Sequence, residues 1–131
     1  MKKPALWLAC SAALTTAYAA DWVPIEFDGD GVAIYMDKTS IKANGSKRQG
    51  WSKIVRETPQ IFEGKLWLYL VAMHEFDCSD RTQRMLSEIG YDTENRQVYH
   101  FGEQKEVTYI APDTMGAARI DAVCKLKIRS K

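Results

Sequence analysis

The chain alternates hydrophobic and polar positions with a period of two over most of its length after residue 20, which is the pattern of β-strands. Two such runs, 22–27 and 32–36, flank the segment 28–31, which reads Asp-Gly-Asp-Gly and tolerates the positive φ of a tight turn. These runs predict a first β-hairpin. A turn or a single helical turn is expected over 37–41, followed by a break in the chain over 43–46.

A third strand is predicted over 50–58, and it is expected to end at Pro59 because proline has no amide hydrogen for a sheet. The densest apolar segment, 66–78, follows it. Both faces of this segment are apolar over its first two-thirds, which predicts a central strand covered by a helix on one face and by a loop or second subunit on the other. A buried helix is the alternative, but the β-branched and aromatic residues and Gly64 favour a strand.

The segment 81–91 fits two structures. Its apolar positions fit helical spacing, whereas its flanks and the turn at 92–95 fit a hairpin with 97–101. We favour the strand. A further short strand is predicted over 107–110, where Pro112 stops it.

After Pro112 the hydrophobic period changes to that of an α-helix, which Asp113 or Thr114 can cap. The inward face is expected to carry Gly116, Ala117, Ile120, Val123 and Cys124, with Arg119, Asp121 and Lys125 outside it. An inward Cys124 can meet Cys78 at the end of the central strand. The sequence therefore predicts an α+β fold, with an antiparallel sheet of about six strands, a C-terminal helix packed on one face and one disulfide.

The N-terminal segment 1–19 has the organisation of a secretory signal peptide. Lys2 and Lys3 precede an uncharged stretch rich in Ala and Leu, and residues 17–19 read Ala-Tyr-Ala, a small-x-small cleavage pattern. Cleavage there leaves 20–131, which is the length of a single domain. We therefore expect an exported protein of the periplasm or the cell surface.

Cys10 raises the alternative of a lipoprotein signal, whose apolar region ends directly before the lipidated cysteine. Only about five apolar residues precede Cys10, whereas a signal core has about 7 to 15, and the apolar run continues to Ala17. We therefore expect a cleaved, soluble export product. Mass spectrometry of the mature N-terminus would distinguish the two, because an acylated Cys10 at the chain start would overturn this expectation.

Composition narrows the classes of partner. The 131 residues are 46% hydrophobic and 27% charged, which is ordinary for a globular domain. Loss of Lys2 and Lys3 changes 18 basic and 17 acidic residues to 16 and 17, a net charge of −1, so no overall attraction to nucleic acid remains. No apolar run reaches the roughly 18 to 20 residues of a membrane-spanning helix, and no transmembrane segment is predicted.

Cleavage also leaves two cysteines, Cys78 and Cys124, in an oxidising compartment where a disulfide is the default expectation. A metal site would need CxxC or paired-histidine spacing, and neither occurs in the sequence. A reactive thiol is less favoured because each cysteine has an available partner.

No arrangement of residues in the sequence predicts catalysis. No serine lies in a GxSxG motif and no Gly-rich phosphate loop precedes a helix. His74 and His100 lie on different predicted strands without metal-ligand spacing, and a hairpin explains the acidic residues at 28–31 better than a calcium loop does. The charged residues around the end of the central strand are expected to form solvated ion pairs: Glu75, Asp77 and Asp80 beside Arg81 and Arg84. We expect no enzyme activity, metal or cofactor.

Binding is the remaining broad class of function. Trp51, Trp67 and Tyr69 supply anchor area wherever they are exposed, although core packing explains most such residues. Basic residues near the C-terminus are predicted either to contact a protein partner or to form a solvated terminus: Lys125, Lys127, Arg129 and Lys131.

A set of residues in order along the chain resembles the surface-adhesin protein E family. The set comprises a Trp near the mature start, Tyr35-x-Asp37-x-x-Ser40-Ile41, Trp51-x-Lys53, Phe76-Asp77-Cys78 followed by Arg81, Tyr91, Ile110-x-Pro112 and Val123-Cys124. The resemblance covers nearly the whole mature chain. The sequence departs from the family pattern at 107–109, where the family usually has a Trp, and at Thr114, where it tends to have Ser.

The resemblance implies a small exported bacterial domain with a sheet of about six strands, a C-terminal helix and a disulfide. The family's namesake is a surface lipoprotein that binds laminin, vitronectin and plasminogen and pairs into dimers. By resemblance, we expect a non-enzymatic binding module for a host matrix or serum protein, with a homodimer as a further expectation.

Two hypotheses about function remain open at this stage. In the first, the adhesin-like module captures plasminogen through Lys131, whose ammonium and free carboxylate together form the zwitterion that lysine-binding kringle sites accept. In the alternative, the protein is a periplasmic inhibitor or an envelope-stress accessory protein. A signal peptide without a convincing lipid anchor favours the alternative.

Overall fold

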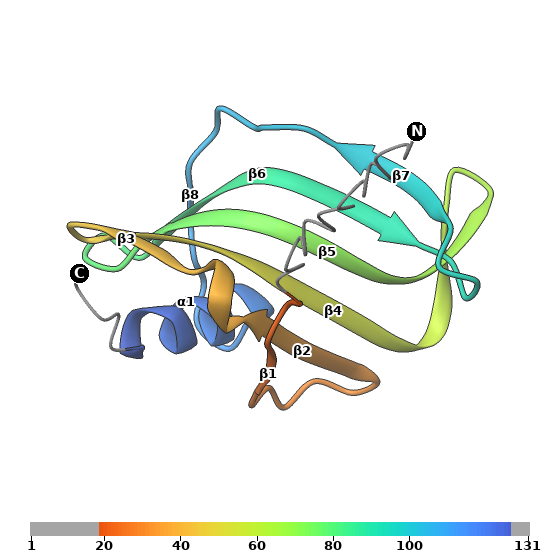
Figure 1. Cartoon of the computed structure of the whole chain (residues 1–131), viewed down its shortest axis with the longest axis horizontal. Helices are drawn as coiled ribbons and strands as arrows, with labels where there is room; N and C mark the ends of the chain where they lie inside the picture. The colour runs from red at the N-terminus through yellow and green to blue at the C-terminus, as the bar shows by residue number, and fades with distance from the viewer. Residues whose placement is uncertain (1–18, 127–131) are drawn as a thin grey trace, which may run out of the picture.

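The computed structural model describes residues 19–126, which form an antiparallel sheet with a C-terminal helix (Figure 1). The sheet has the strand order β1-β2-β4-β5-β6-β7, with β3 paired beside β4 and β8 beside β6. The strands are β1 Trp22–Ile25, β2 Val32–Asp37, β3 Lys42–Asn44, β4 Lys47–Phe62, β5 Lys65–Asp77, β6 Thr82–Tyr91, β7 Gln97–Phe101 and β8 Thr108–Tyr109. The helices are the 3₁₀ turn η1 Lys38–Ser40 and α1 Met115–Lys125.

The period-two segments form the expected strands. The first hairpin is present as β1 paired antiparallel to β2, and the single helical turn expected after it is η1. The dense apolar segment is the central strand β5, which pairs with β4 on one side and β6 on the other. The ambiguous segment 81–91 is a strand, β6.

Two details of the sheet differ from the prediction. Within residues 19–126 the sheet has eight strands rather than about six, and β3 occupies part of the segment 43–46, where the sequence predicts a break in the chain. Gly45 adopts a φ of 60° and turns β3 back on the start of β4, so that Asn44 lies opposite Lys47. The Asn-Gly sequence is a strong hairpin signal, but the residues around it are polar, so no hydrophobic alternation marks the short strand β3.

Pro59 does not end the third strand, because β4 continues to Phe62. The register between β4 and β5 is interrupted between Val55 and Gln60, and pairing resumes with Gln60 opposite Trp67. A proline within this irregular segment removes no ladder hydrogen bond, so it is tolerated inside the strand. Consequently β4 and β5 form a long hairpin that extends past the end of β2, whose pairing with β4 ends at Arg56 (Figure 1).

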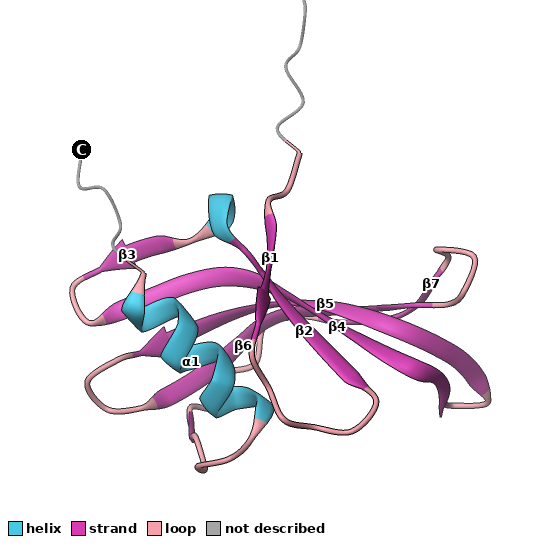
Figure 2. Cartoon of the chain, turned by 90° about the horizontal axis from the view of Figure 1, so that it is seen from below, coloured by secondary structure: helices cyan, strands magenta, loops and turns pink. Residues whose placement is uncertain are grey.

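Helix α1 lies on one face of the sheet only (Figure 2). It begins where the Thr114 hydroxyl accepts a hydrogen bond from the Ala117 amide at 3.2 Å, as a helix cap should. Ile120 and Val123 on its inward face are fully buried against Met36 and Phe76. A second buried cluster lies along the middle of the sheet and comprises Ile34, Ile54, Leu70 and Ala72.

The prediction for Arg119 is wrong. The helical spacing puts this residue outside the inward face of the helix, but only 7% of its surface is exposed, and its guanidinium points into the sheet. The guanidinium donates hydrogen bonds there to the Ser52 hydroxyl and to the His74 ring, and both residues are themselves buried. The long apolar stem of arginine fills the space between helix and sheet, while its polar end finds partners on the strands.

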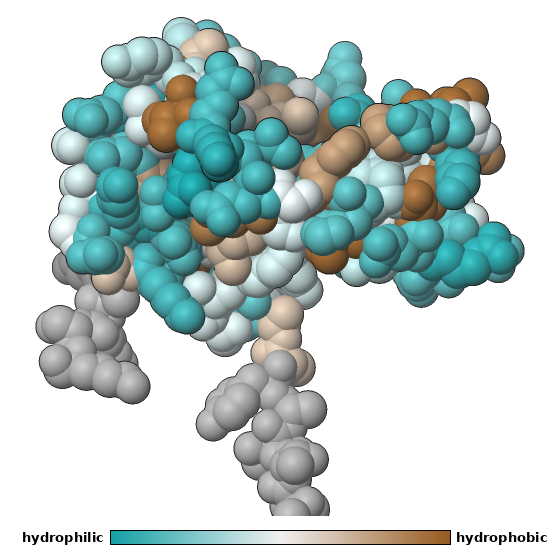
Figure 3. Space-filling view, turned by 90° about the horizontal axis from the view of Figure 1, so that it is seen from above, coloured by the Kyte–Doolittle hydropathy of each residue, from teal (hydrophilic) through white to brown (hydrophobic). Residues whose placement is uncertain are grey.

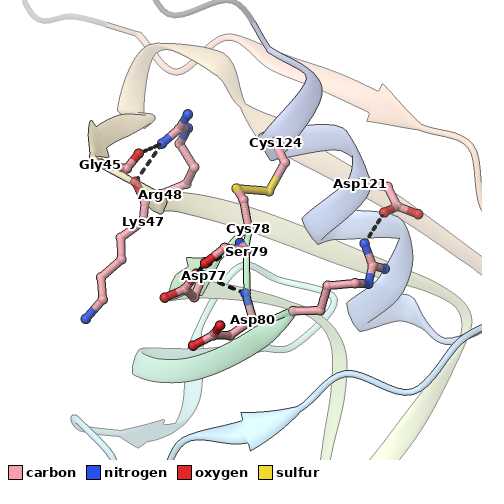
Figure 4. The surroundings of a disulfide bond; sticks show 10 residues. Gly45, Lys47, Arg48, Asp77, Cys78, Ser79, Asp80, Asp121 and Cys124 are labelled. Carbon is pink, nitrogen blue, oxygen red and sulfur yellow. Dashed lines mark hydrogen bonds and ion pairs between the residues drawn. A yellow bond between two sulfur atoms is a disulfide. The ribbon is translucent and has the colours of Figure 1, made fainter.

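The disulfide expected between Cys78 and Cys124 is present and joins the turn after β5 to the last turn of α1 (Figure 4). The two sulfur atoms lie 2.05 Å apart and the two Cα atoms 5.9 Å apart. The Cys78 amide donates a hydrogen bond to the Ser46 carbonyl at 2.8 Å, which fixes the turn against the β3–β4 hairpin. The helix is therefore attached covalently at its C-terminal end.

Most of the predicted signal peptide, including Cys10 and the cleavage pattern before Ala19, lies outside the described residues. The same is true of Lys127, Arg129 and Lys131 in the basic tail. Within residues 19–126, no helix is long and apolar enough to cross a membrane.

Gly90 on β6 is buried directly beneath the ring of Tyr99 on β7, and a Cβ added at Gly90 would overlap that ring. Tyr99 has little room to move, because its ring packs against Phe62 at 4.8 Å and its hydroxyl donates to Glu88 at 3.1 Å. We expect Gly90→Ala to lower the free energy of unfolding by about 1 to 3 kcal/mol. Urea denaturation would measure the loss. Gly45→Ala is the comparison variant, because a Cβ added there overlaps no neighbour and any loss reflects only the backbone strain of a φ of 60°.

Candidate binding surface

The face of the sheet opposite α1 is rich in aromatic and aliphatic side chains. Along β4 and β5 the residues that face the helix are buried, such as Ser52, Ile54 and Ala72, and those that alternate with them are half-buried. The described part of the chain places no helix over the second face (Figure 2). We call this surface the open face, and its residues are Trp51, Lys53 and Val55 on β4, Tyr69, Val71 and Met73 on β5, and Ile89 and Tyr91 on β6.

Lys53 occupies the middle of the open face and is held by aromatic rings. Its Nζ lies 4.8 Å from the centre of the Tyr69 ring and 5.9 Å from the centre of the Trp22 ring, which is a cation–π geometry. Tyr69 in turn stacks on Tyr91, with ring centres 4.9 Å apart and planes 13° from parallel. A positive charge is thus displayed among rings that share one surface.

The Tyr69 hydroxyl is fixed at the edge of this stack. It donates a hydrogen bond to Asn95 Oδ1 at 3.1 Å. Burial is the main cause that raises the pKa of Tyr69, and the nearby Tyr91 and Asp92 raise it further. The hydroxyl therefore stays protonated and available as a hydrogen-bond donor at neutral pH. The stack therefore has an apolar body and a polar end, which is the character of residues that anchor protein interfaces.

A second apolar surface lies at the projecting end of the β4–β5 hairpin. Ile61 and Leu66 face each other across the two strands and are 73% and 56% exposed. Beside them the rings of Phe62, Tyr99 and Phe101 form a cluster, with the Phe62 ring 4.8 Å from Tyr99 and 5.6 Å from Phe101. Figure 3 shows hydrophobic side chains gathered at the end of the molecule where β4 turns into β5.

The buried contact of Arg119 with Ser52 and His74 is a polar cluster, but its chemistry is structural. Arg119 Nη1 lies 3.2 Å from His74 Nδ1 and 3.3 Å from the Ser52 hydroxyl. Burial, and then the charge of Arg119, lowers the pKa of His74 to about 3, whereas burial lowers the pKa of Arg119 only to about 10 against the opposing charge of Glu88. Neutral His74 therefore accepts from charged Arg119, and a base this weak is poorly matched to proton transfer near pH 7.

The charged residues around the end of β5 form ion pairs. Glu75 pairs with Lys47 at 3.7 Å and with Arg84 at 3.5 Å, and Arg84 also pairs with Glu103. A hydrogen bond from Gln49, with smaller effects of Lys47 and Arg84, holds the pKa of Glu75 below its usual value. The Glu75 carboxylate is therefore ionised at neutral pH and occupied by its ion pairs and hydrogen bond.

Asp77 belongs to the turn that carries the disulfide (Figure 4). Its Oδ1 accepts hydrogen bonds from the Ser79 hydroxyl at 2.8 Å, the Ser79 amide at 3.0 Å and the Asp80 amide at 3.2 Å. Those bonds, that of Ser79 foremost, lower the pKa of Asp77. Within residues 19–126 no group of three His, Cys, Asp or Glu side chains is placed to hold a metal ion.

The structure separates the residues that the sequence proposed for binding. Trp51 and Tyr69 lie on the open face, Trp67 lies at the hairpin end with its ring 6.1 Å from that of Tyr99, and all three are half-buried. Lys125 is exposed at the end of α1, and the other tail residues lie outside the described range. No pattern in the sequence assigns a binding role to Lys53 or Tyr91, because their contact with Tyr69 depends on strand register.

Within residues 19–126, the antiparallel sheet carries helix α1 on one face and presents aromatic side chains on the other (Figure 2). Sequence comparison matches the chain to surface-adhesin protein E over residues 22–125, and the protein belongs to this family. Membership of an adhesin family implies a binding protein rather than an enzyme. A comparison with curated protein sequences gives no match.

Solved structures of protein E from Haemophilus influenzae share this fold. One crystal form has a TM-score of 0.62 at 11% sequence identity, covering 83% of this chain and 91% of that one. A second has a TM-score of 0.56 at 13% identity, covering 83% and 87%. Protein E from a non-typeable strain has a TM-score of 0.56 at 14% identity, covering 83% and 78%. At these identities the similarity shows a common fold.

Proposed function

We propose that this protein is an exported, non-enzymatic adhesin whose protein ligand docks on the open face of the sheet. The observation that carries the proposal is the position of Lys53, a cation held between Trp22 and Tyr69 in the middle of an apolar surface. Aromatic residues beside a partly desolvated charge are typical of the energetic centres of protein interfaces. A carboxylate of the ligand would complete this arrangement.

Family membership supports host matrix and serum proteins as the ligands, with laminin, vitronectin and plasminogen as the first to test. We expect Lys53→Glu to weaken capture of the true ligand at least tenfold, because it repels a carboxylate and removes the contact with the rings. Biolayer interferometry with residues 20–131 on the immobilised proteins would measure this. Lys42→Glu is the matched control, since Lys42 is exposed on β3. If both variants and the unmodified protein bind the ligand equally, the open face is not the binding site and this part of the proposal is wrong.

Plasminogen capture has a separate route through the basic tail. The proposed partner residues there are Lys125, Lys127, Arg129 and Lys131. If Lys131 enters a kringle site, deletion of Lys131 abolishes plasminogen capture in the same assay, while Lys53→Glu still weakens the capture of other ligands. Undiminished plasminogen binding by the truncated chain would reject this route alone.

We also propose that the open face pairs with a second copy when no ligand covers it, which would give the expected homodimer. Sedimentation equilibrium would detect the dimer, and Lys53→Glu would change its dissociation constant whereas Lys42→Glu would not. A protein that stays monomeric up to about 100 μM would contradict pairing through this face.

Location distinguishes the adhesin from the alternative of a periplasmic inhibitor or envelope-stress accessory protein. An adhesin of the cell surface is cut when protease is added to intact cells. A protein that protease does not reach, and that osmotic shock releases, acts in the periplasm and favours the alternative.

A further inference from the structure

An apolar groove of about 440 Å³ runs between the edge strand β1 and helix α1, which lie next to each other in Figure 2. Buried Met36 and half-buried Ile25 belong to the adjoining core and line the groove from the sheet. The remaining apolar lining comes from Val23 and Pro24 on β1 and from Ala118, Ala122 and Leu126 on the helix side. The volume falls within the roughly 300 to 1,000 Å³ of small-molecule sites.

The charges around the groove favour an anion. Lys38 and Lys125 line it and are exposed. Of the two acidic residues in the lining, Asp121 is already paired with Arg81 at 2.9 Å, which leaves Glu26 against the two lysines. The lining therefore combines an apolar surface with two exposed lysines, which face Glu26 and an Asp121 that Arg81 already pairs.

The edge of β1 is poorly suited to an added peptide strand. The Lys38 amide donates to the Asp21 carbonyl, so the bonded pairs of the hairpin are those at Asp21, Val23 and Ile25, and Pro24 falls between them. The Pro24 nitrogen therefore faces away from β2, where it offers no donor. A ligand in this groove gains from apolar contact rather than from a ladder of backbone hydrogen bonds.

We propose that the groove binds a single-chain anionic amphiphile of the fatty-acid class, with its acyl chain along the groove and its carboxylate beside Lys38 and Lys125. This site is separate from the open face, and its occupation does not depend on a protein ligand. Burial of each CH₂ group gives up to about a fourfold gain in affinity, so the dissociation constant should fall about fourfold to tenfold from decanoate to laurate.

Isothermal titration of residues 20–131 with decanoate and laurate, below their micelle concentrations, tests the proposal directly. Dodecyltrimethylammonium has the chain length of laurate with the opposite charge, and we expect it to bind at least fivefold more weakly. Absence of laurate binding at millimolar concentration, or equal binding of the two head groups, would overturn the proposal.

Two variants locate the site. Ala122→Phe fills the groove from the helix and should weaken laurate binding at least tenfold, whereas Ala43→Phe, on the exposed β3 hairpin, should have no effect. Because a bulky residue can disturb folding, Lys38→Glu combined with Lys125→Glu provides a second test through exposed positions, with an expected loss of about fivefold. Equal loss in Ala43→Phe, or no loss in the other variants, would overturn the assignment.

A different occupant of the groove would be the chain's own C-terminal segment, since Leu126 lines the groove and residues 127–131 follow it. A protein truncated after Leu126 should bind laurate as the longer chain does. Binding that appears only after truncation would show that the tail fills the groove, and the amphiphile proposal would then be wrong.

Discussion

Replacement of both Cys78 and Cys124 by serine is expected to lower the free energy of unfolding by about 4 kcal/mol. The disulfide closes a loop with a sequence separation of 46 residues, and a loop of that length strongly restricts the unfolded chain. Its loss also releases the C-terminal end of α1, where Val123 is fully buried beside Cys124. A loss of this size is a large share of the roughly 5 to 15 kcal/mol typical of a domain.

Urea denaturation of the oxidised protein, the reduced protein and the double variant measures this loss. The reduced protein and the double variant should share a midpoint, because both lack the cross-link, and the oxidised protein should have a higher one. Thiol titration of denatured, unreduced residues 20–131 should find no free thiol. Two free thiols, or one midpoint for all three samples, would refute the expected role of the disulfide.

Acidification below pH 6.5 is expected to destabilise the protein through His74. Burial and Arg119 lower the pKa of His74 from 6.5 in the unfolded chain to about 3 in the folded one. Between these values the unfolded chain binds more protons than the folded protein, so stability falls as the pH falls through this window. The loss at about pH 4.5 is on the order of 2 to 3 kcal/mol relative to neutral pH.

Denaturation midpoints between about pH 7 and 4.5 test this expectation, and His74→Gln should flatten the profile over that range. His100→Gln is the matched control, because His100 is exposed on β7 and should leave the profile of the unmodified protein intact. Arg119→Gln should make the loss of stability smaller and end it at a higher pH, since the charge of Arg119 helps to hold the folded-state pKa of His74 down. An unchanged profile in His74→Gln would assign the acid sensitivity to carboxylates instead.

The fold was largely predictable because local patterns and tertiary packing agree in it. The alternation in β2, β5 and β6 reflects one face packed beneath the helix or the core, and the change of period after Pro112 marks α1. The strand β3 escaped prediction because it is short and exposed on both faces, so no hydrophobic alternation marks it. Pro59 misled the prediction because the break in register around it depends on its pairing with β5.

The binding surface was less predictable than the fold. Leucines on one set of alternate positions of the central strand and aromatic residues on the other indicate two apolar faces, and one of these is the open face. The contact of Lys53 with Trp22 and Tyr69 joins three separate strands, and no local pattern specifies which residues become neighbours. Arg119 was misplaced for a similar reason, since its partners Ser52 and His74 lie far from it in sequence.

The cation held at the centre of the open face restricts how two copies can stack. A twofold axis passing through Lys53 would bring two ammonium groups together in an apolar interface, with no carboxylate between them to offset the repulsion. Symmetric pairing must therefore place its axis away from this residue, toward Met73 or Tyr91, so that each lysine meets a different part of the other copy. If the proposed pairing through the open face occurs, the position of its twofold axis is thus constrained by a single charge.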